Sequence, residues 1–156
     1  MRAAAVLTIA ALIGVCVGAW PVLSPAATPA GRGEPISGCR VTDGDTIRCG
    51  DERIRLLGID APELPGHCRR ERRCVPGDPV ASTEALRADL AGEVRIVRVG
   101  KDRYGRTLAI VATSAGDLSC RQLARGAAMY RSDWDDGGRV ATKCPQAAMH
   151  QNRTIL

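Results

Sequence analysis

The sequence predicts a mainly β fold with helices, in the form of a five-stranded OB-fold barrel that carries two or three helices. Two observations predict it. Three short extended runs joined by tight turns come first, and one amphipathic helical pattern separates them from two further extended runs. Five short strands with a helix between the third and the fourth is the element order of an OB-type barrel, in which closure removes exposed sheet edges.

The first three strands are expected to form a meander. Asp43-Gly44 lies between two extended runs and indicates a hairpin, since glycine accepts the positive φ of a tight primed turn. A second reversal at residues 50–52 leads into a short strand over residues 53–59. Strands laid side by side bring the first turn close to the end of the third strand, so we expect Asp45 and Asp60 to face one cavity.

After the third strand, the sequence predicts a loop followed by helices and two further strands. Asp78-Pro79 is typical of an N-cap followed by proline at the first helical position. The predicted elements are a helix over residues 79–90, strands over 94–99 and 107–113, a helix over 118–125 and a short last helix over 145–151.

The N-terminal segment has the pattern of a targeting sequence. Residues 3–20 are almost wholly apolar and lead into small residues suited to cleavage near Ala30. The expected organisation is an export signal over residues 1–30, a flexible lead-in over 31–36 and one domain over 37–156. An uncleaved membrane anchor is the alternative, because the apolar run over residues 3–20 is just long enough to span a bilayer, which takes roughly 17–25 residues. Both place the domain outside the cytoplasm, as a secreted, periplasmic or membrane-anchored protein.

The cysteines fit an oxidising compartment. The chain has 7, and setting aside Cys16 in the N-terminal segment leaves an even number. Lipidation of Cys16 is disfavoured, because Val15 precedes it where a small residue is expected. Spacing favours the pairs Cys39–Cys49 across the first hairpin, Cys68–Cys74 around a small loop and Cys120–Cys144 at the tail. A zinc site using Cys68, Cys74 and His67 is the alternative, which the absence of a Cys-x-x-Cys pair disfavours.

The charge of the chain is compatible with a polyanionic partner without proving one. The formal net charge is +5. Residues 64–79 form a loop rich in proline and glycine that carries four arginines, Arg69, Arg70, Arg72 and Arg73. This loop either binds phosphate or is a solvated basic loop closed by a disulfide, and the sequence favours neither.

Three sequence blocks carry a resemblance to a known family. Residues 41–46 (VTDGDT), 55–63 (RLLGIDAPE) and 102–106 (DRYGR) resemble, in order and spacing, the signature blocks of the staphylococcal nuclease (thermonuclease) family. One block alone is weak evidence, since DGDT occurs in many hairpins, but three together are specific. The resemblance covers roughly residues 39–134 and implies an SNase-like OB-fold domain.

The resemblance also implies a calcium site and a catalytic set. In that family Ca²⁺ is held by two carboxylates and one main-chain carbonyl, which correspond here to Asp45, Asp60 and Ala61. A carboxylate that contacts the attacking water and two arginines that grip the phosphate correspond to Glu63, Arg55 and Arg106. Ala61 departs from the type member, which has threonine there. Arg103 and Tyr104 are either substrate contacts or turn residues.

These residue types suit phosphodiester hydrolysis. The reaction adds negative charge to an already anionic phosphorus, and a hard divalent cation with two guanidinium groups can offset that charge. Calcium prefers oxygen ligands, and arginine presents a planar fork that matches phosphate oxygens. Whether Glu63 is the general base is left open, because the metal and arginines can activate water without it.

The sequence therefore predicts an exported, monomeric, calcium-dependent hydrolase, an endonuclease of thermonuclease type. Its substrates are DNA and RNA, cleaved with low sequence specificity, and no obligate protein partner is implied. The alternative is a non-catalytic OB-fold module that binds nucleic acid or a protein. The complete set of carboxylates and arginines favours the enzyme. Membrane contact is expected only if the N-terminal segment is not cleaved.

Overall fold

The computed structural model describes residues 33–68 and 70–152. The expected export signal or anchor and the first residues of the lead-in lie outside this part of the chain. Within the described part, no helix combines the length and the apolar character needed to cross a membrane.

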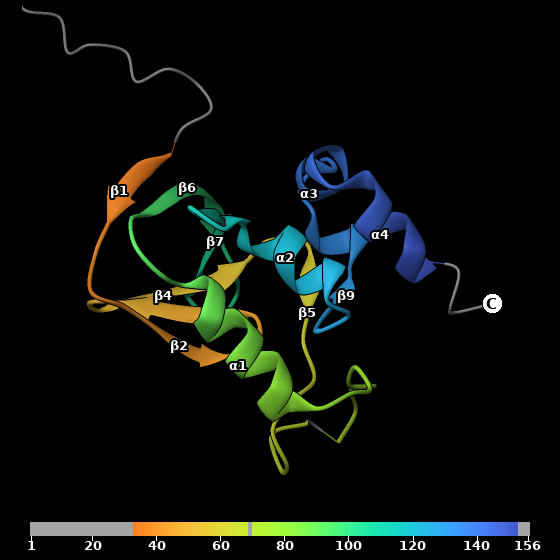
Figure 1. Ribbon diagram of the computed structural model, residues 1–156. Helices are drawn as coiled ribbons and strands as arrows, with labels where there is room; N and C mark the ends of the chain where they lie inside the picture. The colour runs from red at the N-terminus through yellow and green to blue at the C-terminus, as the bar shows by residue number, and fades with distance from the viewer. Residues whose placement is uncertain (1–32, 69, 153–156) are drawn as a thin grey trace, which may run out of the picture.

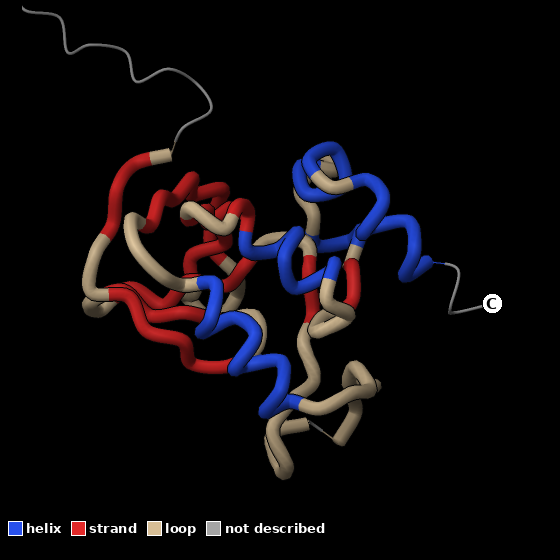
Figure 2. Tube along the Cα trace, viewed as in Figure 1, coloured by secondary structure: helices blue, strands red, loops and turns tan. Residues whose placement is uncertain are grey.

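Most of the strands join one sheet (Figures 1 and 2). Its hydrogen-bonded order is β1-β6-β7-β4-β3-β2, and β8 pairs with β7. The strands are β1 (Glu34–Ile36), β2 (Cys39–Asp43), β3 (Thr46–Cys49), β4 (Glu52–Leu56), β6 (Val94–Lys101), β7 (Thr107–Thr113) and β8 (Gly116–Asp117). The five expected strands are β2, β3, β4, β6 and β7, and their order confirms the predicted fold class. The expected third strand is interrupted at Gly58, and its end becomes β5 (Ile59–Asp60), which pairs with β9 (Met129–Tyr130).

The lead-in differs from the prediction at its last three residues. Glu34–Ile36 is not a flexible segment but strand β1, which pairs antiparallel with β6 through Glu34↔Ile96 and Ile36↔Val94. The proline and glycine content of the lead-in indicated flexibility, but the free edge of β6 supplies hydrogen-bond partners that composition alone does not reveal.

The described residues form four α-helices, of which the sequence predicted three. The helices are α1 (Pro79–Asp89), α2 (Leu118–Ala124), α3 (Arg139–Lys143) and α4 (Pro145–Asn152). Asp78 caps α1 as predicted, because its Oδ1 accepts from the amides of Val80 at 2.8 Å and Ala81 at 3.1 Å. Helix α3 was not predicted, because residues 127–144 show no clear helical periodicity.

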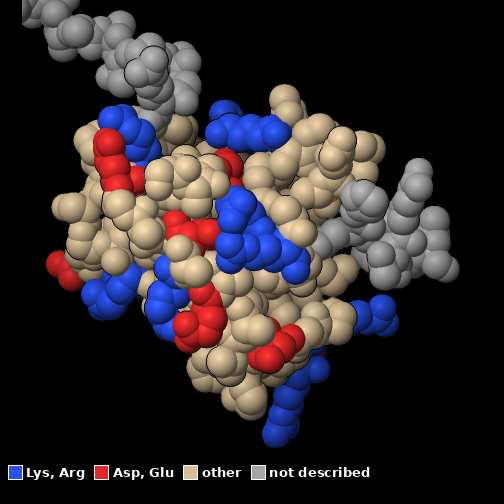
Figure 3. Space-filling model, in the orientation of Figure 1, with Lys and Arg blue, Asp and Glu red and all other residues tan. Residues whose placement is uncertain are grey.

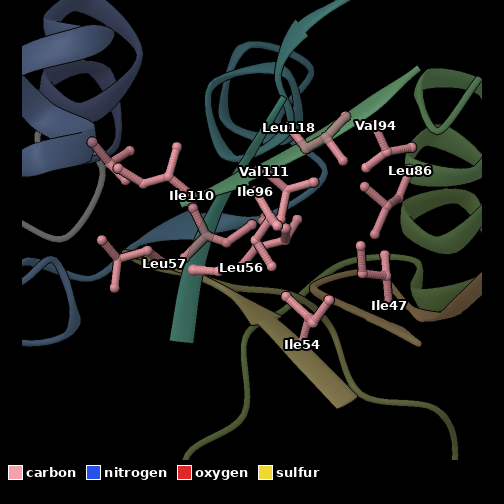
Figure 4. Packing of buried hydrophobic residues seen from close by; sticks show 14 of the residues in the cluster. Ile47, Ile54, Leu56, Leu57, Leu86, Val94, Ile96, Ile110, Val111 and Leu118 are labelled. Carbon is pink, nitrogen blue, oxygen red and sulfur yellow. The ribbon is translucent and has the colours of Figure 1, made fainter. Parts of the chain in front are cut away.

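The hydrophobic core lies between the sheet and helices α1 and α2 (Figure 4). Ile47 and Ile54 come from neighbouring strands β3 and β4, and Leu86 and Leu118 come from the two helices; each is 0% exposed. Burying a side chain of this size contributes about 1.5–3 kcal/mol. The core therefore fixes β3, which Asp45 directly precedes, and β4, which carries Arg55.

All three predicted disulfides are confirmed. They are Cys39–Cys49, Cys68–Cys74 and Cys120–Cys144. The first joins residues that face each other in register on β2 and β3. The second uses both cysteines of the alternative zinc site, which is thereby disfavoured.

Gly44 is required for a different reason from the one that the hairpin pattern suggested. It is not among the glycines with positive φ. A Cβ atom at this position would instead lie 2.0 Å from Oγ of Ser82 and 2.7 Å from Cβ of Ala61. The Ser82 hydroxyl cannot easily move, because it donates to the carbonyl of Ala127 at 2.6 Å. The turn before β3 therefore packs directly against α1.

We predict that Gly44→Ala destabilises the protein by about 1–3 kcal/mol, the usual cost of overpacking. Urea unfolding followed by circular dichroism measures the effect. Gly100→Ala is the matched control, because a Cβ atom added at Gly100 would meet no atom of the described residues within 4 Å, and Gly100 does not have a positive φ. A loss of stability in Gly100→Ala as large as in Gly44→Ala would contradict the packing argument.

Candidate active site

A buried arginine joins the two expected metal-binding carboxylates. Arg55 lies on β4, and its Nη1 donates to Oδ1 of Asp45 at 2.7 Å while its Nη2 donates to Oδ1 of Asp60 at 3.0 Å. All three side chains are buried. The structure thus brings together residues that the sequence places in a turn, a strand and the end of a strand.

The Asp45 carboxylate is held by its neighbours on both oxygens. Oδ1 also accepts from the hydroxyl of Thr46 at 2.9 Å, and Oδ2 accepts from the amide of Ala61 at 2.9 Å. Asp43 has a structural role, since its Oδ1 accepts from the amide of Asp45 at 3.2 Å. The amide of Leu56 donates to the carbonyl of Asp45 at 2.9 Å. The hairpin turn is therefore tied to both β4 and the segment after β5.

Asp60 and Glu63 both bind Arg72, an arginine of the 64–79 loop whose role the sequence left open. Nη2 of Arg72 lies 2.5 Å from both oxygens of Asp60, and its Nη1 donates to Oε1 of Glu63 at 3.0 Å. Hydrogen bonding to Asp60 raises the pKa of Arg72 above its usual value. This arginine of the 64–79 loop is neither a solvated charge nor a phosphate ligand here, but the counter-ion of two site carboxylates.

Trp134 forms the aromatic wall of the site. The guanidinium carbons of Arg131, Arg55 and Arg72 lie 4.1, 5.0 and 5.6 Å from the centroid of its ring, within the range of cation–π attraction. The carbonyl of Trp134 accepts from the amide of Gly58 at 3.1 Å, so the wall is fixed to the chain between β4 and β5.

Asp135, the residue after Trp134, binds the start of α3 and Tyr130. The fully buried carboxylate accepts from the amides of Val140 at 2.7 Å and Ala141 at 3.0 Å, and from the hydroxyl of Tyr130 at 2.7 Å. Burial and this hydrogen bond raise the pKa of Tyr130 to about 12. Tyr130 is thus tied through Asp135 to the first turn of α3 and has a structural role.

The second expected phosphate arginine lies in a separate turn. Arg106 directly precedes β7, which runs parallel to β4 with Leu108 beside Arg55. Its Nε donates to Oδ2 of Asp102 at 2.7 Å. Burial raises the pKa of Asp102, but hydrogen bonds from Arg106 and Tyr104 outweigh it and hold the pKa below its usual range. Within the described part of the chain, Arg106 forms its ion pair with Asp102 and not with the site carboxylates.

Tyr104 and Arg103 lie at the tip of the same turn. Tyr104 is 45% exposed, and the guanidinium carbons of Arg103 and Arg106 lie 4.9 and 5.5 Å from its ring centroid. A groove of about 700 Å³ borders this turn and is lined in part by Arg53, Arg98 and Thr107. Asp45, Asp60 and Glu63 do not line that groove.

The surface has no single sign of charge on the face that Figure 3 shows. Acidic and basic side chains alternate there. Many of the arginines in the described residues are paired with carboxylates, as in the contacts of Arg121 and Arg125 with the buried Asp89 at 3.2 and 2.8 Å. Many of the positive charges therefore have a local counter-ion, and the net charge of the chain stays +5.

The residues fit the expected cation in the chemistry of their donors. Asp45 and Asp60 present carboxylate oxygens to the two arms of one guanidinium, so both face the same region. In the described part of the chain, no three His, Cys, Asp or Glu side chains cluster as a metal site by themselves. The expected set needs only two side chains with a main-chain carbonyl, and calcium accepts such oxygen ligands together with water.

Burial decides the protonation of Asp45. Removal of the carboxyl from water raises its pKa from 3.8 to about 6; Arg55 opposes this rise, and the nearby Asp43 adds to it. The folded protein therefore binds a proton at Asp45 more readily than the unfolded chain does. The stabilising contribution of this proton is absent well above pH 6 and grows as the pH falls from about 6 to about 4.

We predict that, in metal-free protein, the free energy of unfolding of the wild type rises relative to that of Asp45→Asn by up to about 3 kcal/mol between about pH 8 and about pH 4, at about 1.4 kcal/mol per pKa unit. Urea unfolding of both proteins across this range measures the difference. Asp51→Asn, a substitution of an exposed turn carboxylate, is the control. A difference that does not change with pH would show that Asp45 keeps an ordinary pKa.

Sequence reasoning missed two contributors and underrated a third. Arg72 was one of four loop arginines with no feature to single it out, and Arg131 was not considered. Trp134 was expected to pack in the core more readily than to form part of a site. The run of arginine and tryptophan in residues 131–134 (RSDW) was a weak signal that an aromatic–guanidinium cluster forms there.

Comparison with known proteins agrees with this geometry. Residues 53–152 match the family model described as staphylococcal nuclease homologue. The succinoglycan biosynthesis protein ExoI of Rhizobium meliloti (strain 1021) is 35% identical over 116 residues, which cover 72% of this chain and 61% of the relative. An uncharacterized endonuclease of Haemophilus influenzae is 32% identical over 57% of this chain and 48% of the relative.

The thermonuclease of Staphylococcus intermedius is 39% identical over 92 residues, or 51% of this chain and 49% of the relative. The chain thus spans about half to three fifths of the length of the curated relatives that it matches. The family match covers β4 from its second residue and every described element that follows it. Arg55, Asp60, Glu63 and Arg106 lie within the matched range. The chain belongs to the staphylococcal nuclease homologue family.

Proposed function

We propose that this protein is a calcium-dependent nuclease that hydrolyses the phosphodiester bonds of DNA and RNA with low sequence specificity. The observation that carries the proposal is the convergence of Asp45 and Asp60 on the guanidinium of Arg55, with Glu63 joined to Asp60 through Arg72. The relatives named endonuclease and thermonuclease support the same chemistry.

The metal ligands proposed are Asp45, Asp60 and the main-chain carbonyl of Ala61. When bound, calcium would polarise a phosphate oxygen and offset the charge that develops in the transition state. The amide of Ala61 already holds Oδ2 of Asp45, which orients that carboxylate before any ligand arrives. Such preorganisation avoids the cost of ordering the ligand during binding.

The arginines are proposed to bind the phosphate. Arg55 is oriented by two carboxylates, and a guanidinium so fixed loses little conformational freedom when it also contacts a phosphate oxygen. Arg106 is held by Asp102 in a turn beside β4 and can reach toward substrate from that side. Glu63 is the most exposed of the three site carboxylates, and it is proposed to orient the attacking water.

The substrate is proposed to be recognised through its backbone. Arginine pairs with phosphate in any sequence, whereas base edges need side chains placed in a groove. Affinity should therefore fall as salt concentration rises. Tyr104 and Arg103, at the exposed tip of the Arg106 turn, are proposed contacts for the polynucleotide next to the scissile phosphate.

We also propose that the protein acts outside the cytoplasm, as a monomer. The three disulfides support this location, because such bonds persist in oxidising compartments. The apolar N-terminal segment supports export, with either cleavage near Ala30 or retention as an anchor.

The direct test is cleavage of denatured DNA and of RNA by purified protein with intact disulfides, followed by electrophoresis of the products. We expect cleavage in millimolar calcium and its loss when a chelator is added. A protein that binds the polynucleotide but gives no chelator-sensitive cleavage would instead support the non-catalytic binding module.

Arg106→Ala is expected to lower the cleavage rate by about 10²–10³, the typical cost of losing one preorganised transition-state contact. Its ion pair with Asp102 is local and partly solvated, so stability should change by less than about 1 kcal/mol. Initial rates and urea unfolding measure the two effects. Lys101→Ala, which removes the same charge from the exposed end of β6, is the matched control. A rate loss of similar size in both variants would indicate general electrostatics and not a phosphate contact.

A further inference from the structure

Arg72 occupies the cation-binding side of Asp60. One guanidinium nitrogen lies 2.5 Å from both oxygens of that carboxylate, and a second nitrogen contacts Glu63. A calcium ion would need to lie about 2.3–2.6 Å from the same oxygens. Arg72 therefore occupies the same Asp60 oxygens that a bound cation would need.

Arg72 and Arg131 both contact Asp60, and both are more exposed than Asp60 is. The Asp60 side chain is 0% exposed, whereas the side chains of Arg72 and Arg131 that cover it are 33% and 35% exposed. Arg131 contacts Asp60 at 3.5 Å only, and its backbone amide is bound to the carbonyl of Gly58 at 2.8 Å. Of these two arginines, Arg72 makes the shorter side-chain contact with Asp60.

Arg72 lies in an irregular loop that is closed by a disulfide. Residues 61–78 contain no helix or strand among the described positions, and they extend away from the body of the molecule (Figure 2). The Cys68–Cys74 disulfide closes a small ring that contains Arg72. Trp134 offers the guanidinium a cation–π contact at 5.6 Å. The ring limits how far Arg72 can move from the carboxylates.

We propose that Arg72 is a displaceable counter-ion that competes with the metal for Asp60 and Glu63. This inference rests on the proposed calcium-dependent function. A guanidinium and a divalent cation repel each other, and the same oxygens cannot bind both in this geometry. Metal binding must release Arg72, and the affinity for calcium is lowered by the fraction of molecules in which Arg72 is bound. Arg72 thereby sets the calcium concentration at which the site fills.

The test is calorimetric titration of metal-free, disulfide-bonded protein with calcium alone, so that binding and not turnover is measured. Arg72→Gln is expected to bind calcium about tenfold more tightly than the wild type. Arg72→Lys keeps the charge but loses the planar fork, and it should lie between the two. Near-ultraviolet circular dichroism shows whether each variant is folded. If Arg72→Gln does not fold, Arg72→Lys provides the test in its place. Arg73→Gln removes the same charge from a position one residue away and should stay within about twofold of the wild type.

The outcomes separate this inference from the proposed function. Equal affinity in the wild type and Arg72→Gln, or weaker binding in the variant, overturns the competition while leaving a calcium-binding wild type intact as a nuclease candidate. Equal tightening in Arg72→Gln and Arg73→Gln overturns it too, because the effect would then be general electrostatics. If neither the wild type nor any variant binds calcium, both the inference and the calcium-dependent function fail.

Discussion

The buried guanidinium of Arg55 is the interaction on which the site depends. Two carboxylates and a cation are removed from water here, and such a group persists only when each charge has a partner with good geometry. Asp45 comes from a hairpin turn and Asp60 from the end of β5, so Arg55 fixes two otherwise separate segments to β4. A hydrophobic group in its place could pack as well, but it could not orient two carboxylates toward one region.

The fold was largely predictable because its signals are local. The cap at Asp78 and the cysteine spacing each depend on residues close in sequence, and both are found where they were expected. Strand β1 was missed because its cause is distant in the sequence: it needs the edge of β6. Helix α3 was missed because its short span shows no clear helical periodicity, although the nearby Asp135 accepts from the amide of Val140. Gly44 shows a further limit, since the correct residue was selected for a turn conformation when its real constraint is the contact with α1.

The residues of the site also differ in how far they could be predicted from the sequence. Asp45 and Asp60 were predicted to face one cavity, and both contact Arg55. They come together because the meander pairs Thr46 with Arg55 and because β5 follows β4 in the chain. Arg72 could not be singled out, since nothing in a loop sequence says which of its arginines folds back onto the carboxylates. Its approach depends on the path of the whole 64–79 loop and on the ring of Trp134, which comes from the far end of the chain.

The disulfides link consecutive cysteines, first to second, third to fourth and fifth to sixth, when counting starts at Cys39. A chain that is oxidised as it emerges from its N-terminal side therefore meets each correct partner before the next cysteine appears. Reshuffling of wrong pairs, which takes seconds to hours, is not required. Cys16 precedes all six, so a chain that retained it would offer Cys39 a competing partner, and removal of the N-terminal segment would restore an even, ordered set.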